Sequence, residues 1–382
     1  MERFLMQIGI LIPNISLGGA GLVAVNQVKY LIRNGYKAKL LTLSGKSLGV
    51  PSFKIGLNFP LPLMKTSFPL LVNIIWGLNV NEPDVDVIIA HGIASILALR
   101  LKKKYGINYI NYIHHPNSFL HGKPIHEREE VNILGPLAIL PFKLLWNKKD
   151  LAQRDLKSVR EAKYNFVNSW RTLRLLINIY GKIKASVCYP AIEDSFHDVM
   201  PKLENKENFI LYASRHVKQK GFHLLPKIFS RIKSKVKLII VGKTTSITKS
   251  VMDEFERLGL SSKVIFKPNV TRRELLEFYK KSRVLLYPAF KEDFGLSPIE
   301  GMATGCIPVA WKDGGGVEET IQDFKTGLLA KSYDVNDFAS KVDLLLSEDN
   351  VYSSILNEAK IFSQKFSWDL HIKKLLNVLK NG

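Results

Sequence analysis

Apolar runs of strand length alternate with amphipathic stretches along the first half of the chain. Four of these runs predict strands, of which the first is expected to be buried: Met6–Pro13, Lys39–Leu43, Val85–Ala90 and Tyr109–Ile113. Between the first two, the apolar residues of Leu22–Arg33 recur at helical spacing, and Asn34-Gly35 follows as a typical helix end. Strands that alternate with helices predict a parallel sheet with crossover helices.

The same alternation begins again after residue 205. Five apolar runs predict strands there: Phe209–Ala213, Val236–Val241, Lys263–Phe266, Val284–Tyr287 and Ile307–Ala310. The stretch Tyr189–Asn208 contains prolines and acidic residues, which is typical of a linker. We therefore predict an α/β protein with two Rossmann-like domains, 1–195 and 205–365, joined near residue 200. Because ligands of open parallel sheets bind beyond the carboxyl ends of the strands, we look for chemistry in the loops at those ends.

The composition narrows the class of protein. A chain of 382 residues with 46% hydrophobic and 23% charged residues fits a globular protein of about two domains and excludes a disordered one. No run of about 18 uncharged apolar residues predicts a transmembrane helix. We also expect no signal peptide, because a strand-like run without a small-residue cleavage site follows the N-terminus directly. Cys188 and Cys306 are too few for a disulfide framework and favour a reducing, cytoplasmic location.

The formal net charge of +21 is uneven. Residues 1–190 hold 25 Lys and Arg against 10 Asp and Glu, whereas residues 191–382 hold 30 against 24. Such an excess of positive charge attracts nucleic acid, anionic membranes or phosphorylated ligands. The alternative explanation is a general bias toward lysine that has no functional meaning. The segment Ile133–Trp146 carries a single charge and precedes a basic stretch. It is too short to span a bilayer, so it predicts either a membrane-surface segment or an ordinary buried one.

The most informative stretch is Lys291–Glu300, with the sequence KEDFGLSPIE. It follows a predicted strand and opens a predicted helix, so the backbone N–H groups of Phe294, Gly295 and Leu296 form a ready anion site. Glu292 lies in the loop before the helix, and Glu300 lies on the helix, about two turns away from Glu292. Carboxylates suit sugar and ribose hydroxyls because each accepts two hydrogen bonds.

This pattern of two glutamates separated by seven residues, with Phe-Gly after the first, resembles the signature of the family 4 retaining glycosyltransferases of group 1. The resemblance implies the GT-B fold, in which two Rossmann-like domains face each other across a cleft. It also implies transfer of a sugar from a nucleotide-diphosphate sugar with retention at the anomeric carbon. By the same resemblance, Glu300 holds the donor ribose and Glu292 contacts the transferred sugar. The backbone of Phe294, Gly295 and Leu296 meets the diphosphate and the sugar.

Two further stretches of the second half carry the resemblance. Ser214–Gly221, SRHVKQKG, is similar to the family's Gly-Arg…Lys-Gly turn, which implies that Arg215 and Lys220 bind the donor diphosphate. An Arg fork and a Lys point charge neutralise a leaving diphosphate well. Gly242 and the loop residues Asn269 and Val270 correspond to the positions that meet the nucleotide base. The chain departs from the family pattern at Ser214, where glycine is usual, and at Lys243, where a second glycine is usual.

In the first half, Gly18 and Gly19 follow the first predicted strand. They do not fit the dinucleotide fingerprint, because Ser44 and Gly45 follow the second strand where an acidic residue is expected. The resemblance assigns these glycines to the donor phosphate and sugar. It places His114, with His115 as the second choice, near the donor phosphate and anomeric carbon. It also implies that the final helix, within 366–382, returns to the first domain.

The resemblance predicts a metal-independent hexosyltransferase with no resident cofactor, which binds its donor on the second domain and a glycan or lipid-linked acceptor on the first. No metal-ligand spacing stands out in the sequence. A nucleotide-sugar epimerase or a sugar phosphorylase of the same fold is the alternative enzyme. A polyanion-binding protein is the alternative outside enzymes, but it leaves Glu292 and Glu300 without a role, so we do not expect nucleic acid as a partner. The charge of the first half leads us to expect a peripheral position on the cytoplasmic face of an anionic membrane.

Overall fold

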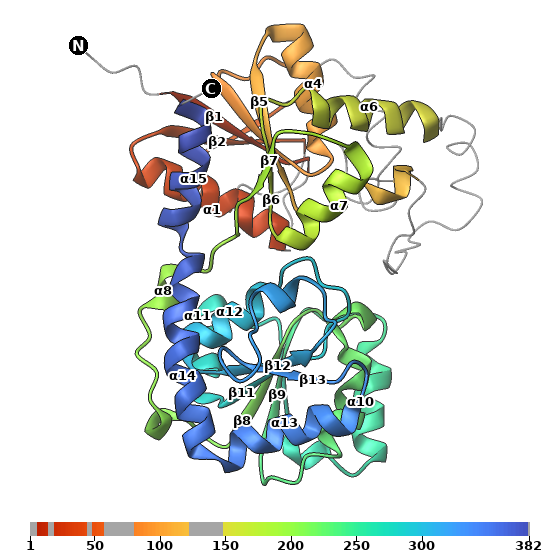
Figure 1. Cartoon of the computed structure of the whole chain (residues 1–382), viewed down its shortest axis with the longest axis vertical. Coiled ribbons are helices and arrows are strands. Elements are labelled where there is room, and N and C mark those ends of the chain that lie inside the picture. Colours follow the sequence, from red (N-terminus) through yellow and green to blue (C-terminus); the bar gives the residue numbers. More distant parts are fainter. Residues whose placement is uncertain (1–5, 14–18, 44–47, 57–79, 122–147, 381–382) are drawn as a thin grey trace. The chain divides into compact units, whose positions relative to one another are not determined.

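The computed structural model describes residues 6–13, 19–43, 48–56, 80–121 and 148–380 (Figure 1). The chain divides into two compact units: the first holds Met1–Tyr189 and Trp368–Gly382, and the second holds Pro190–Ser367. The predicted glycine Gly18 and the apolar segment Ile133–Trp146 lie outside the described residues. Among the described residues, no helix is long and apolar enough to cross a membrane.

The first unit contains a parallel sheet with the strand order β3-β2-β1-β4-β5-β6-β7. Its strands are β1 (Gln7–Leu11), β2 (Lys37–Thr42), β3 (Ser52–Lys54), β4 (Val87–His91), β5 (Asn108–Ile113), β6 (Asn165–Val167) and β7 (Ala185–Val187). Its helices are α1 (Gly19–Arg33), α4 (Ala94–Tyr105), α6 (Lys148–Arg160), α7 (Trp170–Tyr180) and α15 (Trp368–Lys380), with a 3₁₀ turn η1 (Ser118–His121). β4 is buried along its whole length, as the apolar run at 87–90 predicts for a strand covered on both faces.

The second unit repeats this architecture with the strand order β10-β9-β8-β11-β12-β13. Its strands are β8 (Phe209–Ala213), β9 (Lys237–Gly242), β10 (Val264–Pro268), β11 (Val284–Tyr287), β12 (Ile307–Trp311) and β13 (Leu328–Ala330). Its helices are α8 (Asp194–His197), α9 (Leu225–Phe229), α10 (Thr248–Arg257), α11 (Arg272–Lys281), α12 (Leu296–Thr304), α13 (Val335–Ser347) and α14 (Asp349–Ser363). The 3₁₀ turns of this unit are η2 (Leu203–Asn205), η3 (Lys218–Lys220), η4 (Phe222–Leu224), η5 (Ser261–Lys263), η6 (Gly316–Glu319) and η7 (Gln364–Phe366). Two parallel Rossmann-like sheets confirm the predicted fold class.

The boundary between the units lies at Tyr189, a few residues before the predicted end at 195. Residues just after it bond into the second unit: the Ile192 N–H donates to the Phe366 carbonyl at 3.1 Å, and Glu193 pairs with Arg272 at 3.1 Å. At the other end, α15 is part of the first unit and lies beside α1 (Figure 1). Trp368 of α15 stacks on Tyr30 of α1 with ring centroids 5.4 Å apart.

Each sheet has a point where the order of the strands reverses. In the second unit, β8 and β11 are neighbours, but the chain runs outward from β8 to β9 on one side and from β11 to β12 on the other. The loops after β8 and β11 therefore separate and leave room at the carboxyl edge of the sheet. In the first unit, β1 and β4 form the corresponding pair. Ligands of such sheets bind at these two points.

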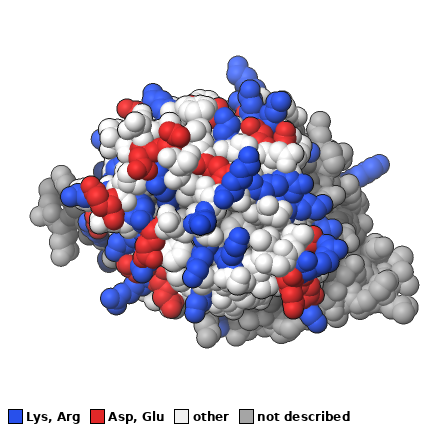
Figure 2. All heavy atoms as spheres, turned by 90° about the horizontal axis from the view of Figure 1, so that it is seen from below, with Lys and Arg blue, Asp and Glu red and all other residues white. Residues whose placement is uncertain are grey.

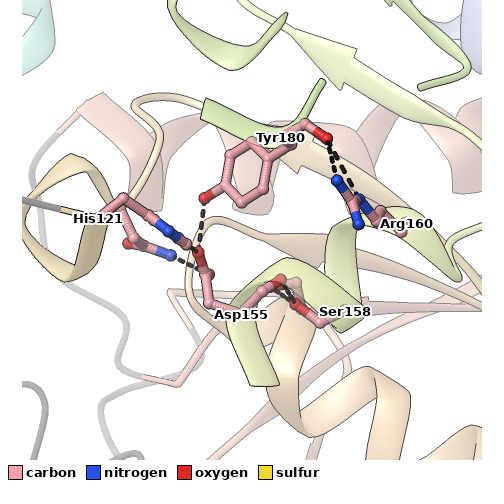
Figure 3. A network of polar contacts seen from close by, with 7 residues as sticks. His121, Asp155, Ser158, Arg160 and Tyr180 are labelled. Atoms are coloured by element: carbon pink, nitrogen blue, oxygen red, sulfur yellow. Dashed lines mark hydrogen bonds and ion pairs between the residues drawn. The ribbon is translucent and has the colours of Figure 1, made fainter. Parts of the chain in front are cut away.

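A buried carboxylate anchors the loop after β5 in the first unit (Figure 3). Asp155 of α6 accepts hydrogen bonds from His121 Nε2 at 2.8 Å, from the Tyr180 hydroxyl at 2.6 Å and from Asn117 Nδ2 at 2.7 Å. These donors come from η1, α7 and the loop between β5 and η1. Three bonds to one buried carboxylate compensate its lost hydration and hold three elements together.

On the face drawn in Figure 2, the Lys and Arg side chains do not form one continuous positive patch. Lys and Arg side chains are spread there among Asp and Glu side chains, with uncharged surface between them. This face therefore offers no single patch for a polyanion.

Candidate active site

The reversal point of the second unit brings Lys220 and Glu292 together. Lys220 ends η3 in the loop after β8, and Glu292 lies in the loop after β11. The Lys220 ammonium pairs with Glu292 Oε2, and both side chains are largely buried, with 16% and 13% exposed. The hydroxyl of Tyr287, the last residue of β11, donates to the same oxygen at 3.0 Å. These three side chains form the Lys220–Glu292–Tyr287 cluster.

The charges within the cluster follow from this geometry. Burial alone would raise the pKa of Glu292, but Lys220 and the hydrogen bond from Tyr287 outweigh burial and hold that pKa below its ordinary value. Burial, together with the neighbouring carboxylate, raises the pKa of the Tyr287 phenol. At neutral pH, Glu292 is therefore an ionised acceptor and Tyr287 a protonated donor.

A glycine-rich stretch fixes the backbone of Glu292. The Glu292 N–H donates to the Gly314 carbonyl at 2.7 Å, and the Gly316 N–H donates to the Glu292 carbonyl at 2.5 Å. A Cβ on Gly316 would lie 2.0 Å from the carbonyl oxygen of Asp293, and Gly315 has a φ of 92°. Only residues without a side chain allow this close approach, so the glycines hold the loop in place without chemistry of their own.

The N-terminus of α12 is attached to the same edge of the sheet. Gly295 precedes the helix with a φ of 87°, Phe294 is buried, and Leu296 begins the helix. The Ser297 hydroxyl in the first turn donates to the carbonyl of Ala213, the last residue of β8, at 2.9 Å. The N–H groups of the first turn, which have no partner within the helix, therefore lie beside the reversal point, where a helix end stabilises negative charge.

A tyrosine hydroxyl links two backbone carbonyls of the turn after β8. The Tyr212 hydroxyl lies 3.1 Å from the Arg215 carbonyl and 3.3 Å from the Lys220 carbonyl, and donates to both. Gly221 follows with a φ of 69°, where a Cβ would lie 2.0 Å from the carbonyl oxygen of Pro288. Lys220 is thus held against the end of β11, whereas the Arg215 side chain is exposed and does not join the cluster.

Glu300, the other glutamate of the motif, is bound by a residue that the sequence analysis did not select. The Arg272 guanidinium donates from Nη2 to Glu300 Oε1 at 2.8 Å and from Nε to Glu193 Oε1 at 3.1 Å. Burial alone would lower the pKa of Arg272, but the two carboxylates raise it above its ordinary value. Arg272 is the first residue of α11, and no local motif in the sequence links it to a glutamate 28 residues further on.

The residues predicted to meet the base lie at the ends of β9 and β10. Gly242 ends β9 with a φ of 141°, and a Cβ there would lie 1.8 Å from the Ser214 carbonyl oxygen. Asn269 follows β10 with a φ of 58°, and its N–H lies 3.5 Å from the Gly242 carbonyl. Val270 comes next and is half-buried. Gly242, Asn269 and Ser214 therefore share one edge of the sheet.

In the first unit, His114 directly follows β5 and is half-buried. Its Nε2 lies 3.0 Å from Nδ1 of His91, the buried last residue of β4. Gly19, the first residue of α1, is exposed, and a Cβ there would touch nothing within 4 Å. Sterics therefore do not require a glycine at this position.

Metal-binding geometry is not found in the described part of the chain: no group of three His, Cys, Asp or Glu side chains there could hold a metal ion. Cys188 and Cys306 are both buried and free.

Comparisons with known proteins agree with this arrangement. The family model of the glycosyl transferases group 1 matches residues 196–362. An uncharacterized glycosyltransferase of Methanocaldococcus jannaschii is 32% identical over 47% of this chain and 46% of its own length. A D-inositol 3-phosphate glycosyltransferase of Xylanimonas cellulosilytica is 29% identical over 44% of this chain and 41% of its own length. These alignments thus span less than half of each curated relative.

Among solved structures, Anabaena HepE in complex with UDP and glucose superposes with a TM-score of 0.74 at 18% identity, over 99% of this chain and 100% of HepE. That likeness shows the fold, because it covers both Rossmann-like units. The family match covers the unit that holds Lys220, Glu292 and Glu300. Residues 196–362 therefore match the glycosyl transferases group 1, and the chain has the GT-B fold of such enzymes.

Proposed function

We propose that the protein is a retaining glycosyltransferase that moves a hexose-type sugar from a nucleotide-diphosphate sugar to a glycan or lipid-linked acceptor. The observation that carries this proposal is the Lys220–Glu292–Tyr287 cluster, which lies at the reversal point of the family-matched unit beside the N-terminus of α12. A sugar diphosphate needs a cation and backbone N–H groups for its phosphates and an ionised carboxylate for its hydroxyls. Lys220, the start of α12 and Glu292 are the groups of this site that suit those needs.

In the proposed reaction, the bond between the anomeric carbon and the diphosphate oxygen breaks, and negative charge develops on the leaving diphosphate. Lys220, the N-terminus of α12 and the exposed Arg215 stabilise that charge. An acceptor hydroxyl attacks from the same face, and its proton passes to the leaving phosphate, so the configuration is retained. Glu292 holds the transferred sugar. Its carboxylate is already bonded to Lys220 and Tyr287, which favours a binding role over that of a nucleophile.

Glu300 is proposed to hold the donor ribose, with Arg272 fixing the direction of its carboxylate. Gly242, Asn269 and Val270 are proposed to line the base, and Gly19 and His114 to approach the donor from the first unit. The reaction is proposed to use neither a metal nor a resident cofactor, since Lys220 and the helix end supply positive charge. Because HepE contains UDP and glucose, UDP-glucose is the first donor to test.

The decisive experiment compares variants of the cluster with a matched control. Lys220→Ala and Glu292→Gln should lower kcat about 10²–10³-fold, the loss typical of removing one group that stabilises transition-state charge. Lys218→Ala changes an exposed lysine in the same turn and should leave the rate unchanged. NMR of the product should show the anomeric configuration of the donor, and EDTA should have no effect. Undiminished transfer by both cluster variants would refute the site.

Incubation without an acceptor separates the rival enzymes. Accumulation of an epimerised nucleotide sugar would indicate an epimerase, and dependence on inorganic phosphate would indicate a phosphorylase. A glycosyltransferase should show only slow hydrolysis of the donor.

We further propose that the protein works at the cytoplasmic face of an anionic membrane, on the basis of the basic excess in residues 1–190. Co-sedimentation with vesicles of anionic and of neutral lipid tests this at low salt. Binding to anionic vesicles alone is expected, and no binding to either kind would contradict it.

A further inference from the structure

Four polar side chains form a row through the first unit. They come from four different elements: His371 from α15, Gln27 from α1, His91 from the end of β4 and His114 from the residue after β5. Successive polar atoms lie 3.0 Å apart between His371 and Gln27, 2.8 Å between Gln27 and His91, and 3.0 Å between His91 and His114. His371, Gln27 and His91 are buried, and only His114 is partly exposed. Each hydrogen bond in such a row determines the direction of the next.

The direction is set at the buried end. His371 Nδ1 lies 2.7 Å from the carbonyl oxygen of Tyr189, which can only accept, so Nδ1 carries the proton. In a neutral ring, His371 Nε2 is then bare and accepts from the Gln27 amide nitrogen at 3.0 Å. This orientation also decides which way the Gln27 amide faces.

The same logic continues to the exposed end. With its nitrogen facing His371, Gln27 presents Oε1 to His91, so His91 Nε2 carries the proton of that 2.8 Å bond. His91 Nδ1 is then bare and accepts from His114 Nε2 at 3.0 Å. The remaining nitrogen of His114, Nδ1, has no proton left to carry in the neutral ring.

The neutrality of the rings follows from their surroundings. Burial lowers the pKa of His371 and of His114 to about 4, and it lowers the pKa of His91 well below its ordinary value. For His91 and His114, the neighbouring histidine rings lower the pKa further. Among the described residues, no carboxylate hydrogen-bonds to any of these rings. Without a negative partner, an imidazolium inside the unit is not favoured at neutral pH.

The titratable neighbours do not change this result. The ring of Tyr112 lies 5.3, 5.0 and 5.3 Å from the rings of His91, His114 and His371, and burial raises the pKa of its phenol. Burial likewise raises the pKa of Cys188 to about 12, although Lys374 opposes this, and its Sγ lies 3.5 Å from His371 Nδ1. Both groups are therefore protonated and uncharged beside the row.

We infer that Gln27, His91 and His371 are positioning residues that hold His114 in the tautomer with a protonated Nε2 and a bare Nδ1, so that a ligand group bonded to this Nδ1 must be a hydrogen-bond donor. A nitrogen without a proton cannot donate to a phosphate oxygen, so the expectation that His114 serves the donor phosphate changes. The Asn168 side chain supports the same residue by donating to the His114 carbonyl at 3.0 Å. The inference rests on the proposed function for the identity of the ligand, but the tautomer itself does not.

The first test needs no activity. In protein labelled with ¹⁵N-histidine, the ring nitrogens of His114 are assigned by comparison with His114→Gln, at pH 7 and without ligand. A protonated Nε2 and a bare Nδ1 are expected. An Nδ1-protonated tautomer or an imidazolium would overturn the inference. Because no donor is present, this outcome is independent of whether the protein transfers sugars.

A substitution in the row tests its direction. In Gln27→Glu, a carboxylate cannot donate to His371 Nε2, so His371 should take up a proton and become an imidazolium at pH 7. His114 should keep its tautomer, because the carboxylate still accepts from His91. Gln153→Glu places the same charge on the exposed surface of α6 and should alter neither ring. A neutral His371 in Gln27→Glu, or a changed tautomer of His114, would contradict the proposed direction.

Ligand binding tests what Nδ1 contacts. His114→Ala should weaken UDP-glucose binding about ten-fold, the effect of one net hydrogen bond, and leave UDP binding unchanged. A rise in the acceptor KM alone would assign the hydroxyl to the acceptor sugar. Equal losses for UDP and UDP-glucose would place His114 at the phosphates and overturn the inference, as would no change in any of these values. If the unmodified protein binds no nucleotide sugar, the proposed function fails, and the tautomer measurement still stands separately.

Discussion

The contacts of Arg272 give a quantitative prediction about the stability of the second unit. Its guanidinium holds Glu300, whose side chain is only 8% exposed, and Glu193, whose side chain is 33% exposed. It also lies over the ring of Phe196, 4.8 Å from the centroid. Arg272→Ala removes all three contacts and leaves the Glu300 carboxylate inside the protein without a cation.

The magnitude follows from the burial of each partner. A hydrogen bond to a charged group contributes about 1.5–3 kcal/mol, and an unpaired buried charge costs about 3–5 kcal/mol. The more exposed pair with Glu193 adds at most about 1 kcal/mol. Since Arg272 itself is 38% exposed and water can enter the vacated space, we expect the free energy of unfolding to fall by about 3 kcal/mol. For a unit of this size, that lowers Tm by about 6–12 °C.

Urea unfolding and calorimetry of the whole chain measure this effect on the transition of the second unit. Arg273→Ala removes an exposed arginine from the next position of α11 and is the matched control. In a double-mutant cycle, Glu300→Gln should remove most of the penalty, with a coupling of about 2 kcal/mol. If Arg272→Ala were no more destabilising than Arg273→Ala, the reasoning from burial and charge would be refuted.

Three further predictions concern positions where the chain offers a contrast. Gly221→Ala should lower the free energy of unfolding in urea by more than about 2 kcal/mol, because its Cβ would meet a backbone carbonyl at 2.0 Å. Gly259→Ala has a similar φ of 66° but open space around it, so it should cost about 1 kcal/mol. Equal costs would contradict the steric account. The free energy of unfolding should fall as the pH is lowered from 6.5 to 4, because His371 has a folded pKa of about 4 and the unfolded chain binds the proton first. This histidine alone accounts for about 3 kcal/mol of that fall. An unchanged dependence of stability on pH in His371→Gln would argue against this account. Asp155→Ala should lower the free energy of unfolding by about 3–5 kcal/mol in thermal unfolding, because three donors lose their acceptor. Asp150→Ala near the start of α6, where the side chain is 39% exposed, should lower it by at most about 0.5 kcal/mol. Equal losses of Tm for these two aspartates would show that the buried network is not important for stability.

Most of the strands that were predicted correctly are largely buried, and β10 is an exception, since none of its residues is buried. β8, β11 and β12 are buried and carry uninterrupted apolar runs, so their position is visible in the sequence alone. The strands that sequence reasoning missed are β3, β6, β7 and β13, and each has three residues. Three residues are too few to show a period, and these strands form because a neighbouring strand already presents unpaired N–H and C=O groups.

The sequence by itself determined the two α/β halves, the motif from Glu292 to Glu300, and the turn that carries Lys220. These are local features, since the alternation of apolar runs, the helix start at Leu296 and the glycine turns depend on residues close together in the chain. The resemblance to a glycosyltransferase family also came from such local motifs.

Only the tertiary structure decided which side chains meet. Lys220 and Glu292 pair across 72 residues because β8 and β11 are neighbours, and Arg272 reaches Glu300 because α11 begins at the same edge of the sheet. The row from His371 to His114 joins residues from both ends of the chain, because α15 packs on α1 in the first unit. The register of strands and the packing of helices create these contacts, and a pattern of spacing along the chain does not contain them. Charge and tautomer at the site depend on those contacts, so they too were decided by the fold.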